Sequence, residues 1–259
     1  MGKRIKPSEA RRMKPDFFEK RPADVNWTLR VKTRDGQPLE KPIEFVGEDW
    51  EAVSRFGRVE NVVILGSDNK PAFDRPGYYE APNVNVVAWG RDMRTGEVKV
   101  AVLTEERPHA LHPEKPDSDA SLKFGQIPMG FLEKLIGKDQ LHQMEMGKAG
   151  AIREVAEETG ASIVRGFSRP ACPWHNPSPS FVATWSDLYF IEVDLERIGQ
   201  LKLDADRSEL IVKAEYISVR ELLARIREGQ ADDGAIYRAG TSLSAFLIFL
   251  AYYPEFWPR

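Results

Sequence analysis

The sequence predicts an α/β protein in which helices pack on a β-sheet, and three observations support this prediction. Residues 84–89 and 97–103 have strand-like patterns and are joined through Arg94-Thr95-Gly96, which indicates a β-hairpin. A glutamate-rich segment at 145–160 then has helical periodicity. The last third begins with a strand at 210–217, which leads into two helices.

The first 58 residues are expected to form an N-terminal extension that carries a small β-sheet. Residues 27–33 alternate apolar and polar side chains, Asp35-Gly36 suits a hairpin turn, and residues 43–46 resume the strand pattern. The main domain is expected to span residues 59–259, with its first strand at 62–65.

The start of the chain is basic, which leaves two alternatives: contact with nucleic acid, or a solvated and partly disordered tail. We expect the tail. The basic residues concerned are Lys3, Arg4, Lys6, Arg11, Arg12 and Lys14.

Three glutamates lie at helical spacings of three and four residues, so their carboxylates are expected to share one face. They are Glu154, Glu157 and Glu158. Because like charges at this spacing repel one another, a bound cation explains the cluster better than an ordinary solvated helix face does. Hard carboxylate oxygens suit Mg²⁺ or Mn²⁺.

The other side of this helix is expected to dock on the sheet. Ile152, Val155 and Ala156 supply the predicted apolar stripe. Gly160 is expected to end the helix in the left-handed conformation.

This segment resembles the signature of the Nudix hydrolase family, which is Gly, five residues, Glu, seven residues and then Arg-Glu-apolar-x-Glu-Glu-x-Gly-apolar. Residues 153–161 fill the second half, and Glu145 stands eight residues before the signature arginine. Asp139 occupies the place of the leading glycine. The best substitute is Gly130, in a segment similar to the Pro-Ala-Gly strand end of the ADP-ribose pyrophosphatase branch. Residues 131–144 are then expected to form a lengthened loop that borders the catalytic cleft, or a solvent-exposed insertion.

The resemblance implies the Nudix fold, an α/β/α sandwich around a mixed β-sheet. It also implies a Mg²⁺ or Mn²⁺ cofactor, with Glu157 and Glu158 as the principal ligands and Glu154 as a ligand or proton acceptor. The backbone carbonyl of Met129 is a further candidate ligand, and Arg153 is expected to hold a glutamate by a forked ion pair.

Glu145 has two interpretations. It is either a carboxylate that supports the metal ligands from behind or an acid that stabilises the helix N-terminus.

Two residues are candidates for substrate binding on loops. Arg107 follows a strand similar to the one that carries a Gln-x-Arg element in the family, with Glu105 in the Gln place; the alternative is an exposed loop arginine. Trp174 lies in the Pro-rich segment 170–180, which is expected to be a loop over the sheet edge. Its ring is suited to stacking on a nucleobase or to packing against its own loop.

A third candidate, Asp187, comes from a departure from the family pattern. The position of a further catalytic or metal-binding glutamate falls on Thr184 here. Asp187 is the nearest acid, and facing solvent on a strand is its alternative.

The function implied by the resemblance is Mg²⁺-dependent cleavage of the pyrophosphate bond in a nucleoside diphosphate linked to another group, with ADP-ribose or a nucleotide sugar as the leading substrate. The alternatives are a sensor that binds a nucleotide without hydrolysing it and a hydrolase of free nucleoside triphosphates. In the ADP-ribose pyrophosphatase branch an N-terminal extension often helps to form a homodimer. A homodimer is therefore implied, and a β-element packed on its own domain is the alternative.

Composition limits the other partners. A net charge of −3 predicts no general affinity for nucleic acid. Cys172 is the single cysteine, so an internal disulfide is impossible and a reducing, cytoplasmic environment is expected.

The longest apolar stretch, 243–253, is too short to span a bilayer and is expected to be a buried C-terminal helix. Before it, Ser218 and Glu221 form a capping box for a helix that ends at Gly229.

Overall fold

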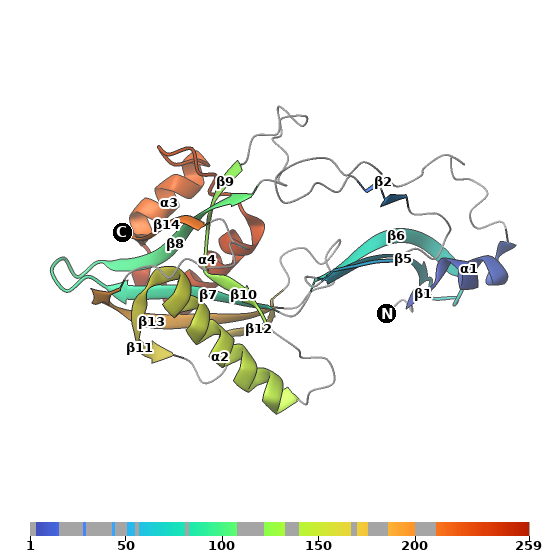
Figure 1. The fold of residues 1–259 in the computed structure, drawn as a ribbon, viewed down its shortest axis with the longest axis horizontal. Helices are drawn as coiled ribbons and strands as arrows, with labels where there is room; N and C mark the ends of the chain where they lie inside the picture. Colours follow the sequence, from blue (N-terminus) through green and yellow to red (C-terminus); the bar gives the residue numbers. More distant parts are fainter. Residues whose placement is uncertain are drawn as a thin grey trace. The chain divides into compact units, whose positions relative to one another are not determined.

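The computed structural model describes residues 4–15, 28–29, 43–44, 51–54, 57–80, 83–107, 122–132, 140–166, 170–175, 186–199 and 211–258 (Figure 1). The chain divides into two compact units, one of residues 1–81 with 179–184 and the other of residues 82–178 with 185–259. The division therefore falls after residue 81, whereas the sequence led us to expect a boundary after residue 58.

The first unit contains a four-stranded sheet. Its strands are β1 (Arg4–Ile5), β4 (Glu51–Ser54), β5 (Gly57–Leu65) and β6 (Pro71–Glu80), and β5 pairs with the other three. The expected strand at 62–65 is thus part of β5 and belongs to this sheet. The expected N-terminal hairpin is present as the antiparallel pair β2 (Thr28–Leu29) and β3 (Ile43–Glu44), while its predicted turn lies outside the described residues.

The basic start of the chain is folded, so the expectation of a disordered tail is wrong for residues 4–15. Helix α1 (Pro7–Met13) follows β1, and its Ala10 packs with Ile5, Val63 and Leu65 in a small apolar cluster. Burial of these side chains holds the segment against β5.

The second unit is built on an eight-stranded mixed sheet. The strand order is β11-β13-β7-β8-β14. In addition, β10 pairs with β7, β12 pairs with β13 and β9 pairs with β8. The strands are β7 (Asn83–Arg91), β8 (Val98–Arg107), β9 (Leu122–Gln126), β10 (Met129–Phe131), β11 (Ala161–Gly166), β12 (Cys172–His175), β13 (Ser186–Ile198) and β14 (Ile211–Ser218). The sheet is mixed because β13 runs parallel to β7 while the other described pairs are antiparallel.

Helices cover both faces of this sheet, which confirms the predicted α/β/α sandwich. Helix α2 (Gln140–Thr159) packs on one face, where its Val155 joins a cluster with Val86 and Tyr189. Helices α3 (Val219–Glu228) and α4 (Gly240–Tyr252) pack on the other face with alternate residues of the same strands, such as Val87 and Phe190. The short helix η2 (Pro254–Phe256) follows α4.

The serine half of the predicted capping box and the predicted end of α3 at Gly229 are confirmed. The Ser218 hydroxyl accepts a hydrogen bond from the Glu221 amide at 3.1 Å, and Gly229 ends the helix with a φ of 85°. Helix α4 confirms the predicted C-terminal helix, although only one side is buried: Phe249 is 1% exposed and Leu247 is 58% exposed.

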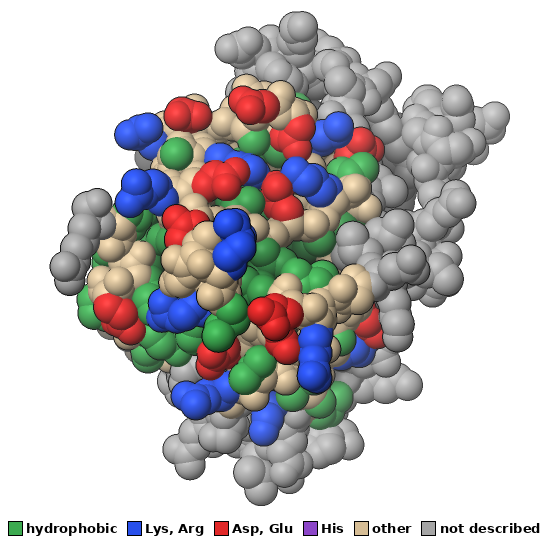
Figure 2. Space-filling model, turned by 90° about the vertical axis from the view of Figure 1, so that its left-hand side faces the viewer, with side chains coloured by type: hydrophobic (Ala, Val, Ile, Leu, Met, Phe, Trp, Pro, Cys, Tyr) green, Lys and Arg blue, Asp and Glu red, His purple; other side chains and the backbone are tan. Residues whose placement is uncertain are grey.

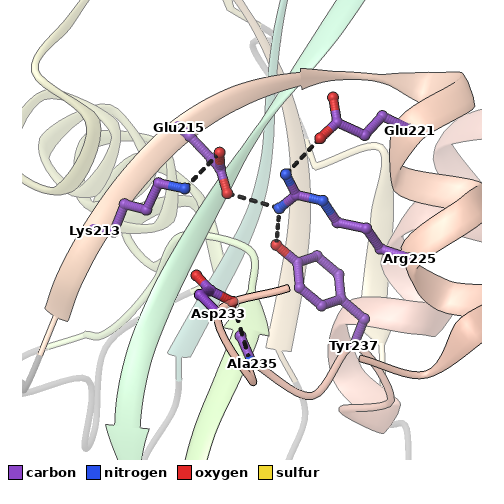
Figure 3. Close-up of polar contacts among 7 residues, drawn as sticks. All are labelled: Lys213, Glu215, Glu221, Arg225, Asp233, Ala235 and Tyr237. Atoms are coloured by element: carbon purple, nitrogen blue, oxygen red, sulfur yellow. Dashed lines mark hydrogen bonds and ion pairs between the residues drawn. The ribbon is translucent and has the colours of Figure 1, made fainter. Parts of the chain in front are cut away.

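Arg225 fastens α3 to the sheet (Figure 3). Its guanidinium donates to Glu215 on β14 at 2.7 Å, to the Tyr237 hydroxyl at 2.5 Å and to Glu221. Lys213 also pairs with Glu215 at 2.8 Å. Burial alone raises the pKa of Glu215, but the hydrogen bonds and positive charges of Arg225 and Lys213 outweigh this, so the net pKa is lowered.

Two local expectations around α2 are wrong. The helix begins at Gln140 and Phe131 belongs to β10, so residues 131–144 are not all loop. The predicted apolar stripe holds only for Val155, because Ile152 is 37% exposed and Ala156 is also exposed. Small residues on the neighbouring turns form the buried face instead, and they are Gly147, Gly150 and Ala151.

The expected loop at 170–180 is also corrected. Residues 172–175 form strand β12, in which Cys172 pairs with Leu188 and His175 pairs with Ser186 of β13. Trp174 therefore lies on an edge strand. The position Thr184 lies outside the described residues.

Candidate functional site

Three strands bring one row of residues to the α2 face of the sheet. Where β10 pairs with β7, Gly130 lies opposite Val84. Where β13 pairs with β7, Asp187 lies opposite the same Val84. Because paired residues on neighbouring strands point to the same face, Gly130, Val84 and Asp187 share the face that α2 covers.

Helix α2 places two of its glutamates against β10. Glu154 and Glu158 are one turn apart, and each is only 6% exposed. The Glu158 carboxylate accepts a hydrogen bond from the Met129 backbone amide at 3.2 Å. The Glu154 carboxylate lies directly over Gly130, where an added Cβ would be 2.0 Å from its Oε1. A glycine is therefore needed at 130 for the carboxylate to approach the strand this closely.

Arg153 contacts its neighbour Glu154 through one atom pair, Nη2 to Oε1, whereas the sequence led us to expect a forked ion pair. Its guanidinium contacts the Glu154 carboxylate at 2.5 Å, while the arginine side chain itself is 47% exposed. Arg153 thus contributes one positive charge at the edge of a region that holds two buried acids.

Glu157 takes a different position from the other two acids. It is exposed on the edge of α2, whereas Glu154 and Glu158 are buried. Within the described part of the chain, no group of three or more His, Cys, Asp or Glu side chains is close enough together to hold a metal ion. The donor chemistry still fits a hard dication, because two carboxylates one turn apart converge on a strand end that also has backbone carbonyls. Gly160 ends α2 with a φ of 66°, as predicted.

Arg107 is held by Glu105, the residue that stands in the Gln place. The Arg107 guanidinium lies 2.7 Å from Glu105 Oε2, which also accepts a hydrogen bond from Gln126 at 2.9 Å. Because Glu105 is almost buried at the end of β8, it fixes Arg107 near the strand end. The arginine side chain remains 32% exposed, so part of it is accessible.

Asp187 faces the first half of α2 together with Tyr189. A Cβ added at Gly147 would lie 2.8 Å from the Tyr189 hydroxyl oxygen and 3.4 Å from Asp187 Oδ2. Burial, followed by the charge of Asp187, raises the pKa of Tyr189 far above its usual value. The same two causes raise the pKa of the Cys172 thiol, which makes this cysteine a poor nucleophile.

A separate cavity of about 520 Å³ lies at the C-terminal end of α2. Thr159, the last helical residue, lines it together with Lys99, Leu195 and Tyr216, and the Tyr216 hydroxyl donates to Thr159 Oγ1 at 2.9 Å. Neither Glu154 nor Glu158 lines this cavity. Figure 2 faces the side that carries the turn between β7 and β8, and acidic and basic side chains are intermixed there.

The structure thus brings several of the candidate residues together at β10 and α2, and they are Met129, Gly130, Arg153, Glu154 and Glu158. Glu145 lies on α2 and Trp174 on β12, but their side chains are outside the described part. Sequence analysis missed Gly147 and Tyr189. Because side chains alternate along a strand, a strand predicted to begin at residue 186 would have placed Asp187 and Tyr189 on one face.

No helix among the described residues is long and apolar enough to cross a membrane.

Comparisons with known proteins give structural likeness alone. No family model matches the chain. No curated protein matches it either. A structure described as an ADP compounds hydrolase is 13% identical, with a TM-score of 0.47, over 79% of this chain and 90% of that one. The NUDIX domain of Shewanella oneidensis NrtR, complexed with ADP ribose, is 15% identical, with a TM-score of 0.41, over 68% of this chain and 88% of that one. A possible asymmetric diadenosine tetraphosphate hydrolase from Jonesia denitrificans is 12% identical, with a TM-score of 0.42, over 69% of this chain and 97% of that one.

Proposed function

We propose that this chain is a Nudix hydrolase that uses Mg²⁺ or Mn²⁺ to cleave the pyrophosphate bond of a nucleoside diphosphate linked to another group. One observation carries the proposal: Glu154 and Glu158, both in the signature, are buried against the strand end at Met129 and Gly130. Two buried carboxylates one turn apart repel each other, and a dication between helix and strand relieves that repulsion.

The residues of the chain have distinct roles in this proposal. Glu154 and Glu158 would hold the ion, and the backbone carbonyl of Met129 would add a further oxygen. Glu157, at the solvent edge, would reach the ion from outside or accept a proton. A bound Mg²⁺ or Mn²⁺ would neutralise charge on the phosphoryl oxygens and lower the pKa of a water.

Arg153 and Arg107 would act through their positive charges. Arg153 holds the Glu154 carboxylate and limits its orientations. Arg107, fixed by Glu105, would contact a substrate phosphate with the exposed part of its guanidinium. Asp187, in the row with Gly130, would accept a hydrogen bond from the attacking water.

ADP-ribose or a nucleotide sugar is the substrate class we propose. Its support is the resemblance of the segment around Pro128, Met129 and Gly130 to the strand end of the ADP-ribose pyrophosphatase branch. We extend the proposal to a homodimer formed with the N-terminal unit and to a cytoplasmic setting, which a single cysteine suits.

The test is hydrolysis of a substrate panel by the purified full chain with Mg²⁺ or Mn²⁺. The panel contains ADP-ribose, nucleotide sugars, dinucleotide cofactors and nucleoside triphosphates. We expect release of a nucleoside monophosphate from ADP-ribose or a nucleotide sugar, and a loss of several orders of magnitude in Glu158→Gln. Glu228→Gln is the matched control, because Glu228 is an exposed helical glutamate with a side chain 63% accessible.

A second candidate function is a sensor that binds the nucleotide without hydrolysing it. The exposed position of Glu157 favours this alternative, because a site with only two inward carboxylates provides fewer ligands for catalytic metal. Binding of ADP-ribose by calorimetry without turnover in the panel would replace the hydrolase proposal with the sensor. Preference for free triphosphates would instead change the substrate class.

A further inference from the structure

Tyr189 has a buried hydroxyl without a hydrogen-bond partner among the described residues. The side chain is only 1% exposed and belongs to the apolar cluster beneath α2. A buried hydroxyl that makes no hydrogen bond destabilises the folded chain, because it has lost its bonds to water. A phenylalanine at this position would avoid that cost, so the hydroxyl calls for an explanation.

Among the described residues, the acid Asp187 lies near this hydroxyl. A Cβ added to Gly147 would lie 2.8 Å from the Tyr189 hydroxyl oxygen and 3.4 Å from Asp187 Oδ2. Both oxygens therefore border the same space above the Gly147 backbone. Any larger residue at 147 would close this space.

The strand register places this acid on the same face of the sheet as the candidate site. Asp187 and Tyr189 are two residues apart on β13, so both side chains lie on the α2 face. Asp187 is also in the row that contains Gly130, which the Glu154 carboxylate covers. Two interstrand steps separate Asp187 from Gly130, or ~10 Å between backbones.

We propose that Tyr189 is a positioning residue for Asp187. Its hydroxyl donates to a water in the space above Gly147, and that water donates to the Asp187 carboxylate. The water-mediated contact holds the carboxylate in the orientation in which it accepts a hydrogen bond from the attacking water. The inference rests on the proposed hydrolase function and adds to it a tyrosine and a glycine that the Nudix signature does not contain.

A matched pair of tyrosines separates positioning from simple stability. Tyr216 is also a tyrosine of the second unit and is partly buried, but its hydroxyl already donates to Thr159 at 2.9 Å. We expect Tyr189→Phe and Tyr216→Phe to change the urea midpoint of unfolding by similar, small amounts. Only Tyr189→Phe should lower kcat, by about tenfold, with KM changed less than twofold.

Gly147→Ala provides an independent variant, because its Cβ would occupy the shared space 2.8 Å from the Tyr189 hydroxyl oxygen and would change no polar group. We expect it to reproduce the kcat loss of Tyr189→Phe. Asp187→Asn should lower kcat further, and Tyr189→Phe should add nothing to Asp187→Asn, because Tyr189 acts through Asp187. Full kcat in Tyr189→Phe, or equal kcat losses in Tyr189→Phe and Tyr216→Phe, would overturn the proposal.

A stability measurement distinguishes failure of this inference from failure of the proposed function. If the wild-type chain hydrolyses nothing in the panel, the hydrolase proposal fails. A double-mutant cycle of unfolding with Tyr189→Phe and Asp187→Asn then decides the contact itself. Coupling of threefold or more in the unfolding equilibrium constant supports the water-mediated contact, and additive effects overturn it.

Discussion

The carboxylate of Glu158 accepts a hydrogen bond from the backbone amide of Met129 at 3.2 Å, so the last turn of α2 is tied to the first residue of β10. One turn earlier, Glu154 covers Gly130, the next residue of the same strand. The two buried acids are thus positioned by successive residues of one short strand. Any change in that strand is transmitted directly to both carboxylates.

Gly130→Ala tests this arrangement. The new Cβ would lie 2.0 Å from Glu154 Oε1 and 2.1 Å from its Cδ, so the carboxylate must move away from the strand. We expect hydrolysis to fall by about 100-fold, since a displacement of about 1 Å in a catalytic group has that effect. The measurement is kcat/KM on the best substrate of the panel.

Gly166→Ala is the control for this substitution. An added Cβ at Gly166 meets no atom within 4 Å, so the same chemical change there should leave hydrolysis within twofold. Equal activity in Gly130→Ala and the wild type would show that Glu154 is not required in its observed position.

Arg225→Met tests the contact between α3 and the sheet. The substitution removes the partner of Glu215, Glu221 and Tyr237 and keeps most of the side-chain volume. We expect a loss of about 2 kcal/mol in the free energy of unfolding, since hydrogen bonds to charged groups contribute about 1.5–3 kcal/mol each. Urea unfolding followed by circular dichroism measures it.

Arg227→Met provides the comparison on the same helix. The Arg227 side chain is 80% exposed and its contact with Glu228 is 3.7 Å long, so its removal should cost less than about 0.5 kcal/mol. A loss in Arg225→Met no larger than in Arg227→Met would contradict the role of Arg225 in fastening α3.

Much of the second unit could be predicted from the sequence because its signals are local. Ser218 and Gly229 bound α3 through capping chemistry that depends only on neighbouring residues. The turn between β7 and β8 follows from Asp92, which accepts hydrogen bonds from the amides of Arg94 and Thr95, and from Gly96 with a φ of 74°.

The parts that could not be predicted depend on contacts between distant segments. The buried face of α2 is set by Gly147, Gly150 and Ala151, because small residues let the helix approach β7 and β10 closely. A search for large apolar side chains at helical spacing instead selects Ile152, which is 37% exposed. Likewise, β12 forms by pairing with β13, which overrides the loop-like composition around Pro173.

Asp92→Asn tests the acid dependence of stability. A hydrogen bond from Lys99 at 2.7 Å, followed by one from the Thr95 amide, lowers the pKa of Asp92 from 3.8 to about 2. A carboxyl with a lowered folded-state pKa contributes stability above its unfolded pKa and loses it as the pH falls through the folded value. This contribution is therefore present above pH 4 and disappears between about pH 4 and pH 2.

The wild-type chain should lose more stability than Asp92→Asn over that pH interval. The measurement is the urea midpoint at steps from pH 5 to pH 2. Parallel curves for the two proteins would mean that the bonds to Asp92 do not contribute to folding. Asp232→Asn is a suitable control, because Asp232 is an exposed acid in a different loop.

Metal binding gives a final prediction that is independent of turnover. An ion that binds only the folded chain stabilises it by about 2.7 kcal/mol at a concentration 100 times its Kd. We expect Mn²⁺ or Mg²⁺ to raise the thermal midpoint of the wild type by several degrees, and EDTA to reverse the change. The shift should be nearly lost in Glu154→Gln and Glu158→Gln, because each removes a buried carboxylate from the pair, and should persist in Glu228→Gln. Glu157→Gln then tests the role of the exposed acid. If this variant loses the metal-induced rise in thermal midpoint, Glu157 is a metal ligand. If it keeps the rise but loses hydrolysis, Glu157 has a proton-transfer role. An undiminished shift in the Glu154→Gln, Glu158→Gln double variant would place the ion elsewhere in the chain and remove the basis for a metal site at β10.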